Sequence, residues 1–182
     1  MTDFETYDVV LLVEQALSPA DARQVRSLHD SLEQPVTYHV LLPIEDAAAR
    51  VESAMGTLGA GELTVSPALA LDEDELAAVR ADCVDRSAHD LAATLAALSE
   101  AGATAEGVVI SDPPVDALAA AVVAHDAQEA IILTQPHVVA EFFHVDWTSK
   151  ARRKIGVPVL HLLEHENFDE QSGGSGEGIT GL

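Results

Sequence analysis

Two short apolar runs, joined by a loop and a basic segment, constrain the fold more than any other part of this sequence. The first run is Ala130–Leu133, the second is Val157–Leu163, and the basic segment Lys150–Lys154 lies between them. Cations are favoured in the last turn of a helix, so the basic segment is expected to end a helix. A strand, a helical crossover and a second strand form the unit of a parallel sheet. The sequence therefore predicts an α/β fold with helices on its sheet.

The rest of the chain repeats this alternation. Further apolar runs predict strands at Tyr7–Val13, Val36–Leu42 and Gly107–Ser111. Helices are expected from Ser18 to about Leu32, from Asp72 to near Gly102, and from Pro113 to Ala124. In the irregular insertion 45–71, the Thr64–Val65 piece could add an edge strand. Five core strands alternating with helices indicate a doubly wound parallel sheet with right-handed crossovers.

The chain is expected to form one domain followed by a tail. Its 182 residues, of which 48% are hydrophobic, are enough for one well-packed core. Aromatic residues make up only 4%, so the core must be aliphatic. From Glu166 the sequence becomes acidic and rich in glycine, a composition that cannot bury enough surface to order itself. We expect a domain at residues 1–165 and a disordered tail at 166–182.

Charge excludes several classes of partner. Thirty-one acidic and nine basic residues give a formal net charge of −22. Such a charge repels nucleic-acid backbones and anionic lipid surfaces, so neither nucleic acid nor a membrane is an expected partner. The sequence has no signal peptide and no apolar run of about 20 residues, so a cytoplasmic protein is expected. The single cysteine, Cys83, is expected to be a buried, unreactive thiol.

Over residues 6–164 the sequence resembles the universal stress protein family. The resemblance rests on the start Tyr7–Val13, the long middle helix, and the ending Val157–Leu160 after a basic helix. It implies a Rossmann-like, three-layer sandwich with strand order 3-2-1-4-5, a homodimer formed through the last strands, and a regulatory or binding role in the stress response. Any doubly wound domain can share the strand pattern, so a general flavodoxin-like fold remains the alternative.

The resemblance also locates a ligand site, at the carboxyl ends of the strands. Nucleotide-binding members of the family carry G-x2-G-x9-G-[ST] after the fourth strand and an aspartate after the first. Here the aspartate position is Glu14, the glycine positions are Thr134, His137 and Trp147, and the hydroxyl position is Thr148, followed by Ser149. Glycine is needed where backbone N–H groups approach phosphates closely. With the spacing kept and the glycines replaced, we expect weak or no binding of ATP or AMP.

An alternative keeps a small-molecule pocket with a different occupant. Trp147 and His137 could stack on a base or line an apolar cavity, and slow hydrolysis could accompany binding. Thr148 or Ser149 could equally be a simple helix N-cap. The partner of the domain would then be a small molecule, or else another protein.

No catalytic machinery is recognisable. The sequence contains no nucleophile elbow, P-loop lysine motif, dinucleotide-binding glycine motif or C-x-x-C pair. His137, His144, Asp146 and Glu141 share one loop, but their spacing matches no closed structural metal site. A binding or regulatory module without a resident metal or cofactor is expected rather than an enzyme.

The last strand is expected to mediate dimerisation. As the outermost strand it would present an apolar edge with unpaired backbone groups, which pairing with a second copy would satisfy. The predicted interface comprises Val157, Val159, Leu160, His161, Leu162, Leu163 and His165.

Overall fold

The computed structural model describes residues 6–44, 73–134 and 153–163. Its core is one parallel sheet whose strands lie in the order β3-β2-β1-β4-β5, which confirms the predicted doubly wound α/β fold. The strands are β1 (Tyr7–Val13), β2 (Val36–Pro43), β3 (Thr104–Ile110), β4 (Glu129–Thr134) and β5 (Val159–Leu163).

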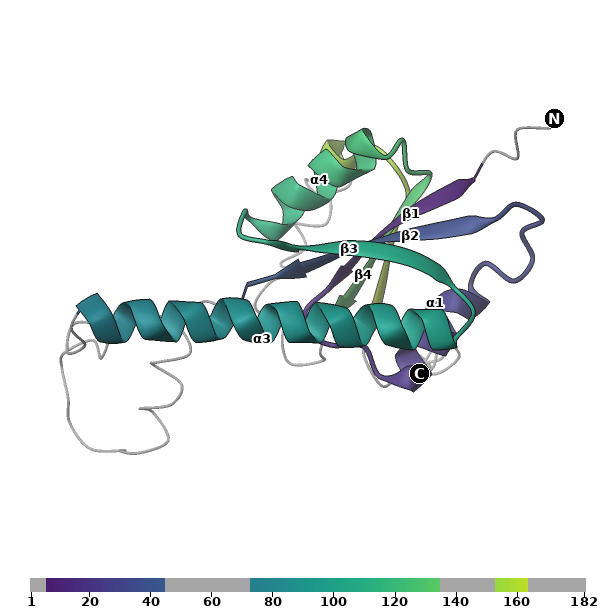
Figure 1. Ribbon diagram of the computed structural model, residues 1–182. Coiled ribbons are helices and arrows are strands. Elements are labelled where there is room, and N and C mark those ends of the chain that lie inside the picture. The colour runs from purple at the N-terminus through teal and green to yellow at the C-terminus, as the bar shows by residue number, and fades with distance from the viewer. Residues whose placement is uncertain (1–5, 45–72, 135–152, 164–182) are drawn as a thin grey trace, which may run out of the picture.

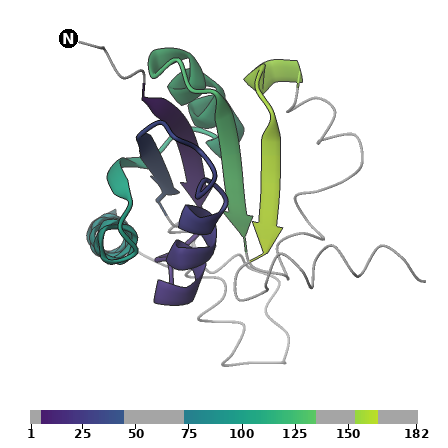
Figure 2. The same ribbon diagram turned by 90° about the vertical axis from the view of Figure 1, so that its right-hand side faces the viewer.

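Helices cover both faces of the sheet and make a three-layer sandwich (Figures 1 and 2). Helices α1 (Pro19–Ser27) and α3 (Glu73–Glu100) pack on one face, and α4 (Pro114–Ala124) packs on the other. The long α3 runs beside β3, and β5 is the outermost strand at the opposite edge (Figure 2). In the part of the chain that the structure describes, no helix combines the length and apolar content needed to cross a membrane.

The alternation of side chains along the strands creates two cores. In β1, Val9, Leu11 and Val13 face α1 and α3, whereas Val10 and Leu12 face α4. All five are buried, as expected for a central strand covered on both faces. Cys83 of α3 is fully buried, as predicted.

Helix α1 begins as predicted but ends earlier. Ser18 is its N-cap, with Oγ accepting a hydrogen bond from the N–H of Asp21 at 3.1 Å, and Pro19 follows at the first helical position. The helix ends at Ser27 instead of about Leu32. Tighter turns follow, such as the bond from the N–H of His29 to the carbonyl of Arg26. These turns place His29 beneath the sheet, where it contacts Tyr38 of β2.

Strand β3 begins three residues before the predicted start because of how α3 ends. Gly102 has φ of +79°, and the N–H of Ala103 bonds to the carbonyl of Leu98 in a Schellman motif. The chain therefore reverses within two residues and enters the sheet at Thr104. Strand β5, in contrast, begins at Val159, two residues after the predicted Val157. The possible edge strand at Thr64–Val65 and the tail 166–182 lie outside the described residues.

Candidate functional site

Of the residues predicted to bind a ligand, two lie in the described structure, and they follow neighbouring strands. Glu14 comes directly after β1 and is exposed, while Thr134 ends β4 and is half-buried. Strands β1 and β4 are paired up to Val13 and Leu133, so Glu14 and Thr134 lie at the same carboxyl edge of the sheet. His137, Trp147, Thr148 and Ser149 lie outside the described residues. The described residues therefore include the carboxyl edge of β1 and β4, where the ligand is expected to bind, and two of the six predicted ligand-binding residues.

The side chain of Thr134 is engaged with its neighbouring strand. Its hydroxyl lies 2.9 Å from Nε2 of His161 in β5, and burial lowers the pKa of that imidazole from its usual value. Where the resemblance places a glycine, this chain therefore has a side chain hydrogen-bonded across the sheet. A hydroxyl held in this way occupies space that a glycine would leave to a ligand.

A second polar cluster lies at the amino ends of the strands. His29 is 4% exposed; its Nδ1 lies 2.7 Å from the Tyr38 hydroxyl and its Nε2 lies 2.8 Å from Oε1 of Glu129. Tyr7 donates to the other oxygen of Glu129 at 3.1 Å. The hydrogen bond from His29 holds the pKa of Glu129 below its usual value, and burial raises the pKa of Tyr38 to about 12.

This amino-end cluster borders a cavity of about 420 Å³. The cavity lies between the turns after α1 and the start of β5. It is lined by Tyr7, Leu28, His29, Ser31, Leu32, Glu129, Pro158, Val159 and Leu160. Since every polar group of the cluster already has a partner, its first role is to close the amino end of the core.

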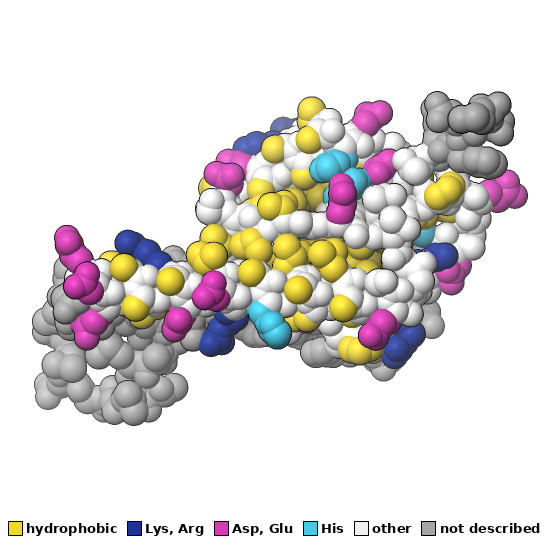
Figure 3. Space-filling view, viewed as in Figure 1, with side chains coloured by type: hydrophobic (Ala, Val, Ile, Leu, Met, Phe, Trp, Pro, Cys, Tyr) yellow, Lys and Arg dark blue, Asp and Glu magenta, His cyan; other side chains and the backbone are white. Residues whose placement is uncertain are grey.

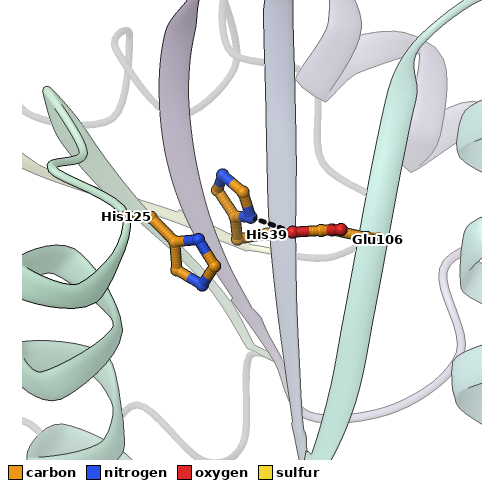
Figure 4. Close-up of side chains that lie close together, drawn as sticks. All are labelled: His39, Glu106 and His125. Atoms are coloured by element: carbon orange, nitrogen blue, oxygen red, sulfur yellow. Dashed lines mark hydrogen bonds and ion pairs between the residues drawn. The ribbon is translucent and has the colours of Figure 1, made fainter.

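A third cluster combines two histidines with two carboxylates on the face that carries α4. His39 of β2 lies between Glu106 of β3, at 2.9 Å from Nδ1, and Asp8 of β1, at 2.8 Å from Nε2. The ring of His125, at the end of α4, stacks on that of His39 with 3.7 Å between centroids. Figure 3 shows histidine and acidic side chains together between α4 and β3, and Figure 4 shows the three residues His39, Glu106 and His125.

The sequence analysis missed this third cluster. Its signal was present, because His39 interrupts the apolar run of β2 and Asp8 interrupts that of β1. Recognising it requires the pairing of His39 with Glu106, and Glu106 was placed outside the predicted third strand.

The predicted dimer residues divide according to the face of β5 that carries them. Leu162 is fully buried and Leu160 packs on the same core, whereas Val157 and Val159 pack on the core beneath α4. His165 lies outside the described residues, and Leu163 is half-buried at the end of β5. The side chain of Leu162 therefore has no accessible surface to offer a partner, and an interface at this edge would depend on the backbone.

Comparisons place the fold among proteins of known structure. No model of a protein family matches the sequence, and no curated protein matches it significantly. A universal stress protein from Archaeoglobus fulgidus is similar over 85% of this chain and 92% of its own, with 11% identity and a TM-score of 0.51. The hypothetical protein MJ0577 is similar over 88% of this chain and 99% of its own, with 10% identity and a TM-score of 0.55.

A third similar structure is a universal stress protein family protein from Arabidopsis thaliana with AMP bound. The similarity covers 90% of this chain and 94% of that protein, with 11% identity and a TM-score of 0.49. The similarities to the Archaeoglobus fulgidus protein and to MJ0577 cover 92% and 99% of those proteins, respectively. The chain therefore has the fold of the universal stress proteins.

Proposed function

We propose that this chain is a homodimeric regulatory or binding domain of the universal stress protein type, with weak or no binding of ATP or AMP. The observation that carries the proposal is the carboxyl edge of the sheet. There the first glycine position of the family motif is Thr134, whose hydroxyl is paired with His161. Glu14 replaces the family's aspartate and is one methylene longer. Both changes act against close contact between backbone and phosphate.

A thermal melt with nucleotide tests the binding part of the proposal. Millimolar ATP or AMP with Mg²⁺ should leave the transition unchanged, because a ligand that does not bind the folded state cannot stabilise it. The Arabidopsis protein solved with AMP serves as the positive control under the same conditions. A shift of several degrees for this chain, with a change in the fluorescence of Trp147, would favour the alternative of a remodelled small-molecule pocket.

Homodimerisation is proposed to use the outer edge of β5. Among the described residues β5 pairs only with β4, and Ala130 donates its N–H to the carbonyl of Pro158 at 3.0 Å. In a parallel ladder this register directs the backbone of Leu160 towards β4 and the N–H of Val159 away from it. That outward N–H can pair with the same strand of a second copy under twofold symmetry.

A matched pair of variants tests this edge. Val159→Pro removes the outward N–H, while Val159→Ala shortens the same side chain and keeps the N–H. Sedimentation should give a dimer for the native chain and Val159→Ala, and a larger monomer fraction for Val159→Pro. Thermal melts check that both variants remain folded. A native monomer, or a dimer that Val159→Pro leaves intact, would show that the chain does not assemble through this edge.

The domain is further proposed to act in the cytoplasm through a protein partner or a small molecule. Its fold and its strongly negative charge support this proposal. Fractionation of cells that express the tagged chain would test it, and recovery in the membrane pellet would contradict it.

A further inference from the structure

His39, Glu106 and His125 lie apart from the carboxyl-edge site, on the sheet face that carries α4. His39 is in the middle of β2, Glu106 is its neighbour in β3, and His125 directly follows α4 (Figure 4). Helix α4 contacts β1, β2 and β4 and leaves the outer strand β3 open, as the 53% exposure of Val108 shows. The cluster is therefore accessible from solvent, although His39 itself is only 7% exposed.

Asp8 holds His39 in a defined orientation. Its Oδ1 lies 2.8 Å from Nε2 of His39, and its Oδ2 accepts a hydrogen bond from the Thr6 hydroxyl at 2.9 Å. The N–H of Asp8 also donates to the side chain of Gln128 at 2.7 Å, which fixes the backbone at this point. In the tautomer with its proton on Nε2, the ring donates to Asp8, because a carboxylate accepts hydrogen bonds only. Nδ1 is then the ring nitrogen that faces Glu106.

With the proton on Nε2, the contact between Nδ1 of His39 and Glu106 requires either a second proton or a metal ion. Nδ1 of a neutral imidazole with its proton on Nε2 presents a lone pair, and Oε1 of Glu106 lies only 2.9 Å from it. Two lone pairs at this distance repel unless a second proton or a metal ion lies between them. Zinc bonds of about 2.0–2.1 Å to nitrogen and about 2.0–2.2 Å to oxygen separate two tetrahedral ligands by roughly 3.3–3.4 Å. This separation is longer than the 2.9 Å between Nδ1 of His39 and Oε1 of Glu106. Only a small movement of the exposed Glu106 side chain is needed.

His125 supplies a second imidazole. The ligand atoms of His39, Glu106 and His125 all lie within 4.8 Å of one another, and the two rings stack at 20°. His125 is exposed, so its ring can turn towards an ion while His39 stays fixed. Two imidazoles with a carboxylate favour zinc and similar transition metals over Mg²⁺ or Ca²⁺, which prefer oxygen ligands.

We propose that His39, Glu106 and His125 bind a divalent transition-metal ion of the zinc type, with Asp8 orienting His39. The pairing of Asp8 with the other ring nitrogen is the arrangement that commonly supports a metal-bound histidine. The fourth position is open to water or to a ligand, since three protein side chains do not complete a tetrahedral site. The charge of −22 also concentrates cations at the surface.

Zinc affinity of the full chain tests the proposal. Protein freed of metal with EDTA is titrated with Zn²⁺ against a chromophoric chelator in about 1 M KCl, which screens non-specific attraction to the acidic surface. Glu106→Gln and His125→Ala alter exposed side chains, and each should weaken zinc binding at least tenfold. Asp8→Asn should weaken it by about 10–100-fold, the effect typical of losing a supporting carboxylate. His89→Ala, an exposed histidine on α3, is the matched control and should bind as the native chain does.

Thermal melts provide a second readout. Excess Zn²⁺ should raise the melting temperature of the native chain and of His89→Ala, and should raise that of His125→Ala much less. Melts without metal establish that each variant folds. If Glu106→Gln and His125→Ala bind zinc as tightly as the native chain, or if the native chain shows no zinc binding in KCl, the cluster is an ion-paired network and the proposal is wrong.

Discussion

Among single residues, Glu129 is the carboxylate at the centre of the amino-end cluster, where it closes the amino end of the core. Its carboxylate accepts from His29 and Tyr7, and the hydrogen bond from His29 is the main reason why its pKa lies below the usual value. A carboxyl whose folded pKa is lowered adds stability above its unfolded pKa, near 4.5, and loses it as pH falls through the folded pKa.

We therefore expect Glu129→Gln to lower the free energy of unfolding at neutral pH by about 1.5–3 kcal/mol, the usual contribution of a hydrogen bond to a charged group. The loss should shrink as pH falls below about 4.5, because the native carboxyl is then protonated as well. Urea unfolding at several pH values measures both quantities. Glu33→Gln, at an exposed site, should change little at any pH, and an equal loss in the two variants would contradict the role given to Glu129.

His161 provides a second group through which the stability of the fold decreases as pH falls, as it does for Glu129. Burial lowers its pKa, so the unfolded chain binds a proton more readily than the folded chain. The stability due to the neutral ring is complete above the unfolded pKa, near 6.5, and is lost as pH falls below it. We expect His161→Gln to flatten the fall in melting temperature between about pH 7 and pH 5.5. His89→Gln is the control, and a slope unchanged by His161→Gln would exclude this effect.

Single residues were predictable where their role is local. Ser18 and Pro19 mark a helix start through their own chemistry, and Cys83 falls on the apolar side of its helix. His29 and His39 were not identified, because their partners Glu129 and Glu106 lie 100 and 67 residues away in the sequence. Only the register of the folded sheet brings such residues together.

Helix α3 packs closely on β3 at Gly107, where the strand has no side chain. A Cβ at Gly107 would lie 2.8 Å from Cδ1 of Leu91 and 2.9 Å from the carbonyl oxygen of Val40. We expect Gly107→Ala to cost about 1–3 kcal/mol, as overpacking of a core does. Chemical denaturation measures the loss.

A double variant separates the two contacts at Gly107. Leu91→Ala removes the contact with the helix, so the double variant should lose less stability than the two single losses added together. Rescue should be partial, because the backbone of Val40 cannot move away without breaking the pairing of β2. If the losses of stability in the two single variants simply add in the double variant, the cost of Gly107→Ala does not come from a clash with Leu91.

The order of the elements was predictable, and their ends were less so. Each of the five strands contains an apolar run, and such runs are the strongest sequence signal for buried parallel strands. The start of β3 was not predicted, because Thr104 and Glu106 interrupt the apolar pattern. An outer strand can contain such polar residues where their side chains are exposed. In the same way, the carboxyl-edge position of Glu14 and Thr134 follows from the fold alone, whereas the hydrogen bond between Thr134 and His161 depends on strand pairing.

At the scale of the whole molecule, charge opposes the compact fold. The chain has a net charge of −22, and folding brings many of its acidic groups closer together than they are in the unfolded chain. The aliphatic cores on the two faces of the sheet must outweigh this repulsion. Salt reduces the repulsion, since the Debye length falls from about 10 Å at 0.1 M to about 3 Å at 1 M ionic strength.

We therefore expect the melting temperature to rise as KCl increases from about 0.05 M to about 1 M, with most of the rise at the low end, where screening changes fastest. The rise should be smaller near pH 4.5 than near pH 8, because protonation of carboxyl groups lowers the net charge before salt is added. Scanning calorimetry across the two variables measures both trends. Sucrose, which favours compact states without screening charge, is the control and should act alike at the two pH values. A melting temperature that stays constant or falls with KCl would show that the acidic surface does not limit the stability of this fold.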